Sequence, residues 1–384
     1  MMKQIPFGKP IIGKEEKDAV CAVMDSGIMV HGPKIKEFEL AFAKFTNAPH
    51  AVGLASCTAA LHLFYFHLGL KPKDEVIVPT QTHVATAHSV ELAGGKPVFV
   101  DSDSSTGNID ISLIESAITP RTRAISLVHY LGMPVNMDAV MSIARKHGLP
   151  VVEDCALAIG TKYRGIHAGL HGNVGCFSFY PVKHMTTAEG GMLITRDENI
   201  AKAIELKRAF GVDRHMGERS IPGMYEVTEL GFNYRMSELE AAMGVCQINR
   251  VSGFLRIRHS NYDCLTRQLI QIPEISLLKS SHDEYESSCY CHCILLNGQL
   301  AAKREQLMKA LKNCGVGTSI YYPHPVPLHV YYRNKYGYRK GQFPNAERIS
   351  DTGIALPVGP HLDEEDMIYI GKSLKESIME VNKP

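Results

Sequence analysis

Leu149-Pro150-Val151-Val152-Glu153-Asp154 is a short apolar run that ends in two carboxylates. Four successive apolar residues are typical of a strand that helices cover on both faces of a sheet. In such sheets, ligands bind at the carboxyl ends of the strands. Glu153 and Asp154 therefore stand where a carboxylate can hold a cationic nitrogen or a metal ion, and a helix N-cap is the alternative role. A carboxylate buried there needs a partner, because uncompensated burial of its charge costs several kcal/mol.

Apolar runs of similar length recur on both sides of this segment, with helical patterns between them. The predicted strands lie at 50–54, 75–79, 97–100, 124–129, 150–153, 174–179 and 191–195. The predicted helices between them lie at 59–68, 85–93 and 137–147. Strands that alternate with helices predict an α/β fold with a doubly wound, mostly parallel sheet of seven strands.

The pattern changes after residue 238. Apolar residues at helical spacing predict one long helix or two across 238–269. Further strands are predicted at 287–296 and 317–322, and further helices at 302–313 and 363–376. Five prolines make 323–358 largely a predicted loop, and a loop of that length is usually functional. We therefore expect a large α/β domain at 1–240 and a smaller α+β domain at 241–384.

Composition and charge exclude several classes of partner. The 384 residues carry 41 Lys and Arg against 40 Asp and Glu, which gives a formal net charge of +1. Duplex DNA and anionic membrane surfaces are bound through a cationic surplus, so we expect no nucleic-acid and no membrane partner. No run of about 18 apolar residues could span a bilayer, and the N-terminus lacks the apolar core of a signal peptide. We expect a cytoplasmic protein.

Ten cysteines are present, and Cys289-Tyr290-Cys291-His292-Cys293 is the densest group. Zinc motifs place two to four residues between their cysteines, so strict alternation argues against a metal site. The alternation predicts instead a strand with three cysteines on one face, where free cysteine acts as a small buried hydrophobic residue. We expect neither a metal site nor a disulfide framework in this chain.

Two further segments suggest chemistry. Gly53–Thr58 passes from a strand into a helix at small hydroxylated residues, and the free N–H groups of that first turn can bind phosphate; an ordinary capped helix is the alternative. In Cys176–Gly191 a strand leads into a turn that carries Lys183. Apolar surroundings lower the pKa of a lysine, which suits Schiff-base chemistry, whereas a surface lysine is the alternative. A phosphate site, a carboxylate for a pyridinium nitrogen and a Schiff-base lysine together match the requirements of pyridoxal phosphate (PLP).

Ordered motifs along nearly the whole chain resemble the sugar aminotransferases of the DegT/DnrJ/StrS family. Besides the three segments above, the motifs include residues 5–6, 27–33, 37–39, 79–86, 128–129 with 132, 231–236 and 355–357. The resemblance implies a fold type I PLP-dependent transferase that forms a homodimer with shared active sites. It also implies L-glutamate as amino donor and a nucleotide-linked keto-sugar, with its ketone at C3 or C4, as acceptor. The product would enter surface polysaccharide or glycoconjugate synthesis.

The resemblance assigns roles to the matching positions of this chain. Lys183 is implied as the catalytic lysine that forms the Schiff base and then moves protons. Asp154 is implied as the partner of the pyridine nitrogen, and His83 as the residue that stacks on the ring. The implied phosphate ligands are Cys57, Thr58, Ser178 and, from the neighbouring subunit, Asn233, for which helix capping is the alternative. The expected contacts to the sugar nucleotide are His324, His329 and Tyr331, for which an exposed polar loop is the alternative.

Three positions depart from the pattern of the family. Cys57 replaces a glycine of the phosphate turn, His83 replaces a residue that is often aromatic, and Leu157 stands where Gln or His is common. A compact thiol should leave the backbone donors in place, and an imidazole can stack on a ring. Leu157 removes a polar contact to the cofactor's 3-oxygen or to the substrate, so that contact would come from elsewhere and the acceptor preference would change.

Two other functions are compatible with the same fold. PLP-dependent sugar dehydratases of this family carry histidine in place of the lysine, and here His184 directly follows Lys183. Counting from the preceding Ser178 places Lys183 in the decisive position, which favours an aminotransferase over a nucleotide-sugar 3-dehydratase. A non-catalytic regulatory protein is the third hypothesis, because a fold alone does not establish activity. Such a protein would be expected to lack Lys183 or Asp154, and both are present.

Overall fold

A seven-stranded sheet forms the centre of the structure, a computed structural model that describes residues 3–213, 221 and 223–383. The strand order is β1-β9-β8-β5-β4-β2-β3, and of these strands only β9 runs antiparallel to its neighbours. The bounds are β1 His50–Leu54, β2 Glu75–Pro79, β3 Lys96–Val100, β4 Thr122–Val128, β5 Val151–Asp154, β8 Val174–Ser178 and β9 Gly191–Thr195. The predicted α/β fold with a mostly parallel seven-stranded sheet is confirmed.

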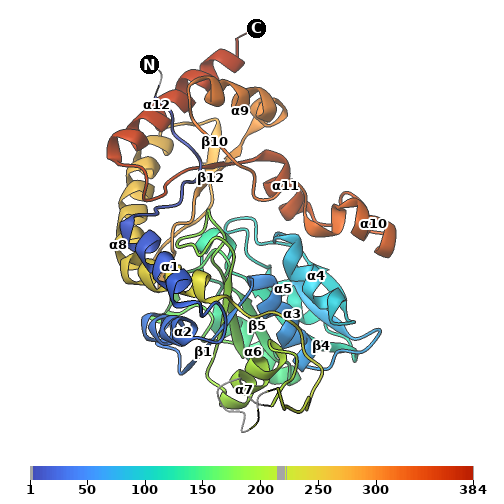
Figure 1. The fold of residues 1–384 in the computed structure, drawn as a ribbon. Coiled ribbons are helices and arrows are strands. Elements are labelled where there is room, and N and C mark those ends of the chain that lie inside the picture. Colours follow the sequence, from blue (N-terminus) through green and yellow to red (C-terminus); the bar gives the residue numbers. More distant parts are fainter. Residues whose placement is uncertain (1–2, 214–220, 222, 384) are drawn as a thin grey trace.

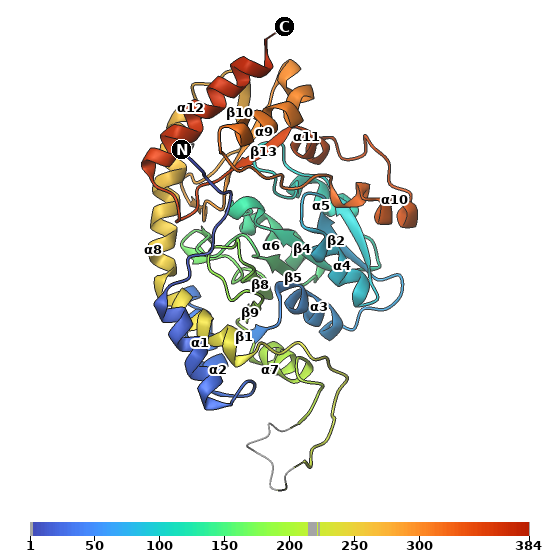
Figure 2. The same ribbon diagram turned by 45° about the horizontal axis from the view of Figure 1, so that its top comes forward.

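Helices cover both faces of this sheet (Figure 1, Figure 2). Their bounds are α1 Lys14–Ser26, α2 Pro33–Thr46, α3 Cys57–His67, α4 Val84–Leu92, α5 Ile111–Ala117, α6 Met137–His147 and α7 Glu198–Lys207. Successive residues of a strand point to opposite faces, so Val152 of β5 joins the core under α3 and α4, whereas Val151 joins the core under α6. This alternation explains the near-continuous apolar runs in the sequence.

A smaller antiparallel sheet of three strands, in the order β10-β12-β13, carries a second core. The elements are β10 Ile275–Leu277, β12 His292–Leu296, α9 Arg304–Asn313, α10 Val330–Tyr336, α11 Pro344–Thr352, β13 Gly353–Leu356 and α12 Glu364–Val381. Short 3-10 turns lie at Tyr130–Gly132, Gly298–Lys303 and Val326–Leu328. A third sheet joins β11 (Tyr285–Glu286) to β6 (Lys162–Tyr163) and β7 (Ile166–His167). It therefore connects the C-terminal part of the chain to the larger one.

One continuous helix of 32 residues, α8 (Glu238–Leu269), joins the two parts. Ser237 caps it in a capping box, because Ser237 and Glu240 each accept the other's backbone N–H. The helix contacts α1 and α2 beside the large sheet and α12 beside the small one, and Figure 1 shows it along one side of both. The expected boundary at residue 240 falls in its first turn, so the division into domains 1–240 and 241–384 stays a prediction.

The predicted strand 287–296 is shorter than expected, because β12 begins only at His292. Cys289 has a φ of 50°, in the left-handed region, which interrupts an extended strand. The N–H of Ser288 donates to the carbonyl of Gly132 at 3.2 Å, so this stretch is attached to a loop of the large sheet. The prediction of three cysteines on one face of a strand is wrong, although all three are buried.

The predicted loop 323–358 contains two helices and a strand, α10, α11 and β13. Pro344 occupies the first turn of α11, where a missing N–H costs nothing, so this proline starts a helix. The predicted strand 317–322 is absent from the described structure, in which only Ser319 makes a bridge, to Ala355. Among the helices of residues 3–213 and 223–383, none is long and apolar enough to cross a bilayer.

Candidate active site

A cavity of about 250 Å³ opens where β4, β5 and β8 end. Its walls come from the start of α3, the loop before α4, the ends of these strands and the turn that follows β8. Six of the seven predicted cofactor residues line it: Cys57, Thr58, His83, Asp154, Ser178 and Lys183. The parallel sheet therefore brings together groups that are widely separated in the sequence, as expected at the carboxyl ends of its strands.

The first turn of α3 borders this cavity. Ser56 caps the helix by accepting the N–H of Ala59 at 3.0 Å. In the described structure the N–H groups of Cys57 and Thr58 have no protein partner, and they lie at the positive end of the helix dipole. Gly191 on β9 makes room for this turn, because a Cβ there would lie 2.4 Å from the backbone nitrogen of Cys57. The arrangement suits a phosphate group.

Asp154 projects from the end of β5 and accepts two short hydrogen bonds, besides a longer one from the Cys57 thiol to Oδ1 at 3.9 Å. Thr86 Oγ1 donates to its Oδ2 at 2.7 Å, and the N–H of Ala156 donates to its Oδ1 at 3.0 Å. Because a carboxylate only accepts, Thr86 must be the donor, and the hydroxyl of Thr82 at 2.7 Å must then donate to Thr86. Asp154 is 4% exposed and forms no ion pair within the described ranges. It presents a fixed negative charge that calls for a cationic partner.

Lys183 reaches the same cavity from the turn after β8. Its Nζ lies 5.5 Å from the centre of the Tyr290 ring, and no carboxylate of the described residues pairs with it. Burial lowers the pKa of Lys183, and the nearby Asp154 carboxylate opposes this shift. A lysine with a lowered pKa carries a free amine more often, which makes it a better nucleophile towards a carbonyl group.

His83 caps α4 and lines the cavity at the same time. Its Nδ1 accepts the N–H of Ala85 at 3.2 Å, and its ring meets the ring of Tyr322 edge-on, with 5.9 Å between the centres. Burial and, to a smaller degree, the charge of Lys183 lower the pKa of His83, and the Asp154 carboxylate opposes this shift. Leu157 is buried in the same wall and offers no polar side-chain group.

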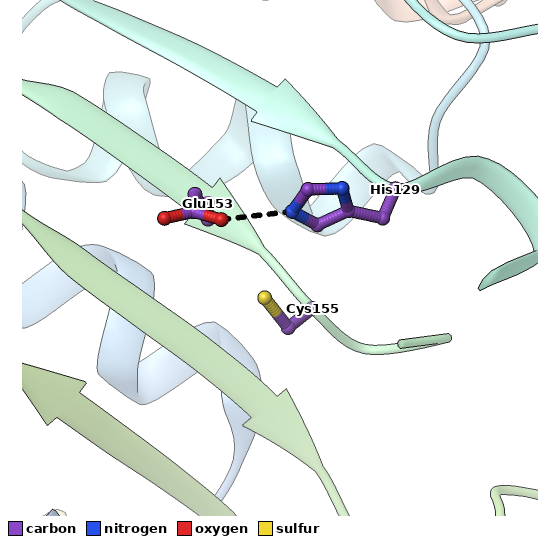
Figure 3. Close-up of side chains that lie close together, drawn as sticks. All are labelled: His129, Glu153 and Cys155. Atoms are coloured by element: carbon purple, nitrogen blue, oxygen red, sulfur yellow. Dashed lines mark hydrogen bonds and ion pairs between the residues drawn. The ribbon is translucent and has the colours of Figure 1, made fainter. Parts of the chain in front are cut away.

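Glu153, the neighbour of Asp154 on β5, has a structural role. Figure 3 shows it beside His129 and Cys155, the one cluster of potential metal ligands that the described residues contain. His129 Nε2 contacts Glu153 Oε2 at 2.9 Å, and backbone N–H groups at 169–172 donate to both carboxylate oxygens at 2.6–2.8 Å. The other nitrogen of His129 accepts the N–H of Val135, and burial raises the pKa of the Cys155 thiol. These atoms are already occupied or protonated, so the cluster is a buried anchor.

Asn233 is exposed and does not line the cavity within the described part of its own chain. It forms a backbone bridge with Ala209. The alternative that Asn233 caps α8 is excluded, because Ser237 is the cap. Its contact with a partner's phosphate site stays a prediction.

The three expected sugar-nucleotide residues lie in two places, and none lines the cavity as far as the described residues define it. The rings of His324 and His329 meet edge-on with 5.5 Å between their centres. Burial lowers the pKa of His329, and the neighbouring His324, His88 and His83 add to this. Tyr331 instead donates its hydroxyl to Glu91 on α4 at 2.5 Å.

Thr86, Tyr290 and Tyr322 are residues of this site that the sequence analysis missed. Thr86 lay within a quoted motif, and the signal was a hydroxyl in the first turn of a helix that begins at the cavity. The two tyrosines come from 287–296 and 317–322, the segments whose secondary structure was mispredicted.

The donor set of the cavity fits PLP. The free N–H groups of α3 suit a phosphate, the unpaired Asp154 suits a protonated ring nitrogen, and the amine of Lys183 suits an aldehyde. When bound, PLP supplies an electron sink for a carbon that loses its proton. The fold and the cavity together define a PLP-dependent transferase of fold type I.

The comparison with known proteins agrees with this class. The chain belongs to the DegT/DnrJ/EryC1/StrS aminotransferase family, whose model matches residues 10–375. It is 35% identical over 379 residues to the spore coat polysaccharide biosynthesis protein SpsC of Bacillus subtilis, covering 97% of each chain. It is also similar to the PLP form of a putative sugar aminotransferase, Spr1654 of Streptococcus pneumoniae, with 28% identity, a TM-score of 0.93 and coverage of 99% and 100%. Helicobacter pylori PseC, an aminotransferase of pseudoaminic acid biosynthesis, has 26% identity, a TM-score of 0.91 and coverage of 98% and 100%. The family and its solved members are PLP-dependent sugar aminotransferases, so PLP is the cofactor.

Proposed function

We propose that this enzyme transfers the amino group of L-glutamate to a nucleotide-linked keto-deoxy-sugar whose ketone is at C3 or C4. The observation that carries the proposal is the pair of Lys183 and Asp154, which face one cavity beside a phosphate-suited helix start and pair with no protein charge in the described structure. The names of SpsC and PseC, which refer to a spore coat polysaccharide and to pseudoaminic acid, support a product destined for surface polysaccharide or glycoconjugate synthesis.

Each residue of the cavity has a task in this proposal. Asp154, fixed by Thr86 and by the N–H of Ala156, keeps a cationic ring nitrogen protonated, because an adjacent anion raises the pKa of such a nitrogen. Lys183 is the nucleophile, and its amine afterwards carries the proton of the substrate carbon. The start of α3 with Cys57 and Thr58 holds the phosphate, and Ser178 adds a hydroxyl to the same group.

A dehydratase is the second candidate, and the position of His184 argues against it. His184 does not line the cavity of Lys183 in the described structure; its ring packs against Tyr290 with 5.5 Å between the centres. Its Nε2 lies 3.3 Å from the carbonyl of Ser288. A dehydratase would need the histidine in the cavity, and here that place is taken by Lys183.

A homodimer with shared sites is part of the proposal. Asn233 is exposed on the loop before α8, outside the cavity of its own chain, and is therefore free to donate to a phosphate held by a second subunit. Hydrogen bonds to a doubly charged phosphate are stronger than those between neutral groups, so such a contact would couple cofactor retention to dimerisation.

The decisive assay supplies the purified holoenzyme with L-glutamate and a panel of UDP-, GDP- and dTDP-linked 3-keto and 4-keto sugars. We expect 2-oxoglutarate and an amino-sugar in equal amounts with at least one acceptor, and a single turnover of glutamate when no acceptor is added. L-Alanine and L-aspartate serve as donor controls. A 3-deoxy keto-sugar formed together with ammonia, in place of an amino-sugar, would identify a dehydratase. Failure of glutamate to discharge the cofactor, with no product from any acceptor, would favour the regulatory hypothesis.

A further inference from the structure

A second cavity, of about 20 Å³, lies at the junction of the two parts of the chain. Residues 7–11 of the N-terminal segment, the turn 181–186, α8 and residues 360–361 enclose it. Figure 1 and Figure 2 show this N-terminal segment descending beside α8. The volume of the cavity exceeds the roughly 10–15 Å³ that one water molecule needs, so the cavity can hold a water molecule or one small ion. Lys183 borders this cavity as well as the larger one.

Arg258 brings a buried charge to the small cavity from α8. It is 5% exposed, and its Nη1 donates to the carbonyl of Tyr290 at 2.8 Å. Its Nε has no hydrogen-bond partner, and no carboxylate of the described residues forms an ion pair with it. A guanidinium taken out of water without an anion is costly, so this position calls for a counter-charge.

Two histidines that line the same cavity each carry an unpartnered ring nitrogen. The Nε2 of His361 lies 3.0 Å from the carbonyl of Pro6, and that of His184 lies 3.3 Å from the carbonyl of Ser288. In each ring Nδ1 is buried and has no partner. A carbonyl only accepts, so His361 carries a hydrogen on Nε2 and gains an Nδ1 donor when it takes up a proton. His184 gains an Nδ1 donor when its hydrogen moves from Nε2 to Nδ1, and it then loses only its 3.3 Å bond to the carbonyl of Ser288.

We propose that this cavity binds one small monovalent anion of halide size, held by Arg258 and by His361 in its protonated form. The fixed positive charges around it belong to Arg258 and Lys9, which both line the cavity. Lys183 also borders the cavity, but burial lowers its pKa and it is the Schiff-base lysine, so it is not counted as a cation. Burial lowers the pKa of His361 and the charges of Arg258 and Lys9 lower it further, so without an anion the ring resists protonation, and an anion is needed to favour it. Asp366 on α12 opposes this shift and is already paired with Lys3 at 2.7 Å. The remaining acidic protons nearby belong to Tyr290 and Cys291, whose pKa values burial raises, so both are neutral.

Proton uptake by His361 determines whether the halide affinity rises or falls with pH. His361 must gain its proton from solvent when the anion enters, so the affinity rises as the pH falls. Above the pKa of His361, the dissociation constant should increase about tenfold per pH unit for one proton taken up. A water molecule in the same place would show no such halide dependence. The inference is independent of which sugar the enzyme uses.

The test measures the thermal unfolding of the holoenzyme in sodium chloride, sodium bromide and sodium isethionate at constant ionic strength. We expect the midpoint to rise with both halides and not with the large isethionate, because a ligand that binds only the native state stabilises it. Crystals grown with bromide should show anomalous scattering from a bromide ion in the cavity. A water molecule there, with equal midpoints in all three salts, would overturn the proposal.

Matched variants test whether Arg258 and His361 hold the anion. Arg258→Leu should weaken halide affinity roughly tenfold or more, as expected for loss of a charged hydrogen-bond donor. Arg256→Leu is the control, since it removes the same charge from an exposed position of the same helix. His361 lies in a loop and is half-buried, so His361→Gln should fold even if Arg258→Leu does not, and it provides a second test. It should bind halide more weakly and lose the pH dependence. Wild-type affinity and pH dependence in His361→Gln would also overturn the proposal.

Discussion

Thr86 offers the sharpest test of the proposed site, because in our proposal it acts on the cofactor only through Asp154. Its hydroxyl donates to Asp154 Oδ2 at 2.7 Å and is buried at the first turn of α4. Thr86→Val keeps the shape of the side chain and removes the donor. Asp154 then keeps the N–H of Ala156 on Oδ1, at 3.0 Å, but Oδ2 is free to turn.

The expected loss of rate in Thr86→Val follows from the strength of the hydrogen bond between Thr86 and Asp154. A hydrogen bond to a charged acceptor contributes about 1.5–3 kcal/mol. Since the bond from Ala156 remains, we take the lower end, which corresponds to roughly a tenfold slower reaction if the whole loss appears in the barrier. Thr82 also loses the acceptor of its hydroxyl, so the variant should be less stable by about 1 kcal/mol or more.

Single-turnover kinetics with L-glutamate, followed by the absorbance of the cofactor, measures this effect directly. The pH profile of that absorbance should also shift to lower pH in Thr86→Val, because a misplaced Asp154 stabilises the protonated ring nitrogen less. Thr86→Ser should restore both rate and profile. Thr46→Val is the control, since that buried hydroxyl donates to the carbonyl of Phe42 at 2.9 Å in α2. A folded Thr86→Val enzyme with the wild-type rate and pH profile would refute the role of Thr86.

Three further outcomes are expected. Lys183→Ala should lower the rate of amino transfer by several orders of magnitude and remove the absorbance of the lysine-bound cofactor. Replacing the exposed Lys202 by Ala is the control and should change neither. Turnover in Lys183→Ala would contradict the assignment. Asp154→Asn should keep the fold and slow the half-reaction with glutamate, measured by stopped-flow absorbance, because the ring nitrogen loses its anion; near-wild-type rates would exclude this role. Mixing Lys183→Ala with Asn233→Ala protein should restore up to about half of the activity per mixed dimer, since one of its two sites holds both native residues. Verified subunit exchange without recovery would place Asn233 outside the partner's site.

The large sheet was predictable because its strands are buried on both faces. Val151 and Val152 face opposite helical layers, so both positions are apolar and the strand appears as an uninterrupted run. The C-terminal part was harder to predict from local patterns. Around Cys289, backbone bonds to the loop at Gly132 replace strand pairing, and no periodicity within 287–296 reveals a partner so distant in the sequence.

The candidate site likewise contains residues that local sequence patterns reveal and residues that they do not. Lys183 and Asp154 were identifiable because each ends or follows an apolar strand, and a charge at that place has few structural uses. Thr86 was missed because its role depends on the position of α4 relative to β5, which is a tertiary relationship. Tyr331 carried an expectation of substrate contact, yet its hydroxyl is bound to Glu91, an arrangement that depends on how α10 packs on α4.

The anchoring of Glu153 contributes to the stability of this enzyme towards acid. Burial alone would raise the pKa of Glu153, but the hydrogen bonds from His129 and the backbone outweigh it, and the pKa lies below its usual value. The ionised group therefore stabilises the fold above its unfolded pKa, and that stabilisation is lost as the pH falls through the lowered value. A proton on Glu153 would face N–H donors that it cannot satisfy. Because Asp154 is the next residue of the strand, protonation of Glu153 should loosen β5 beside the cavity, although Glu153 itself touches no substrate.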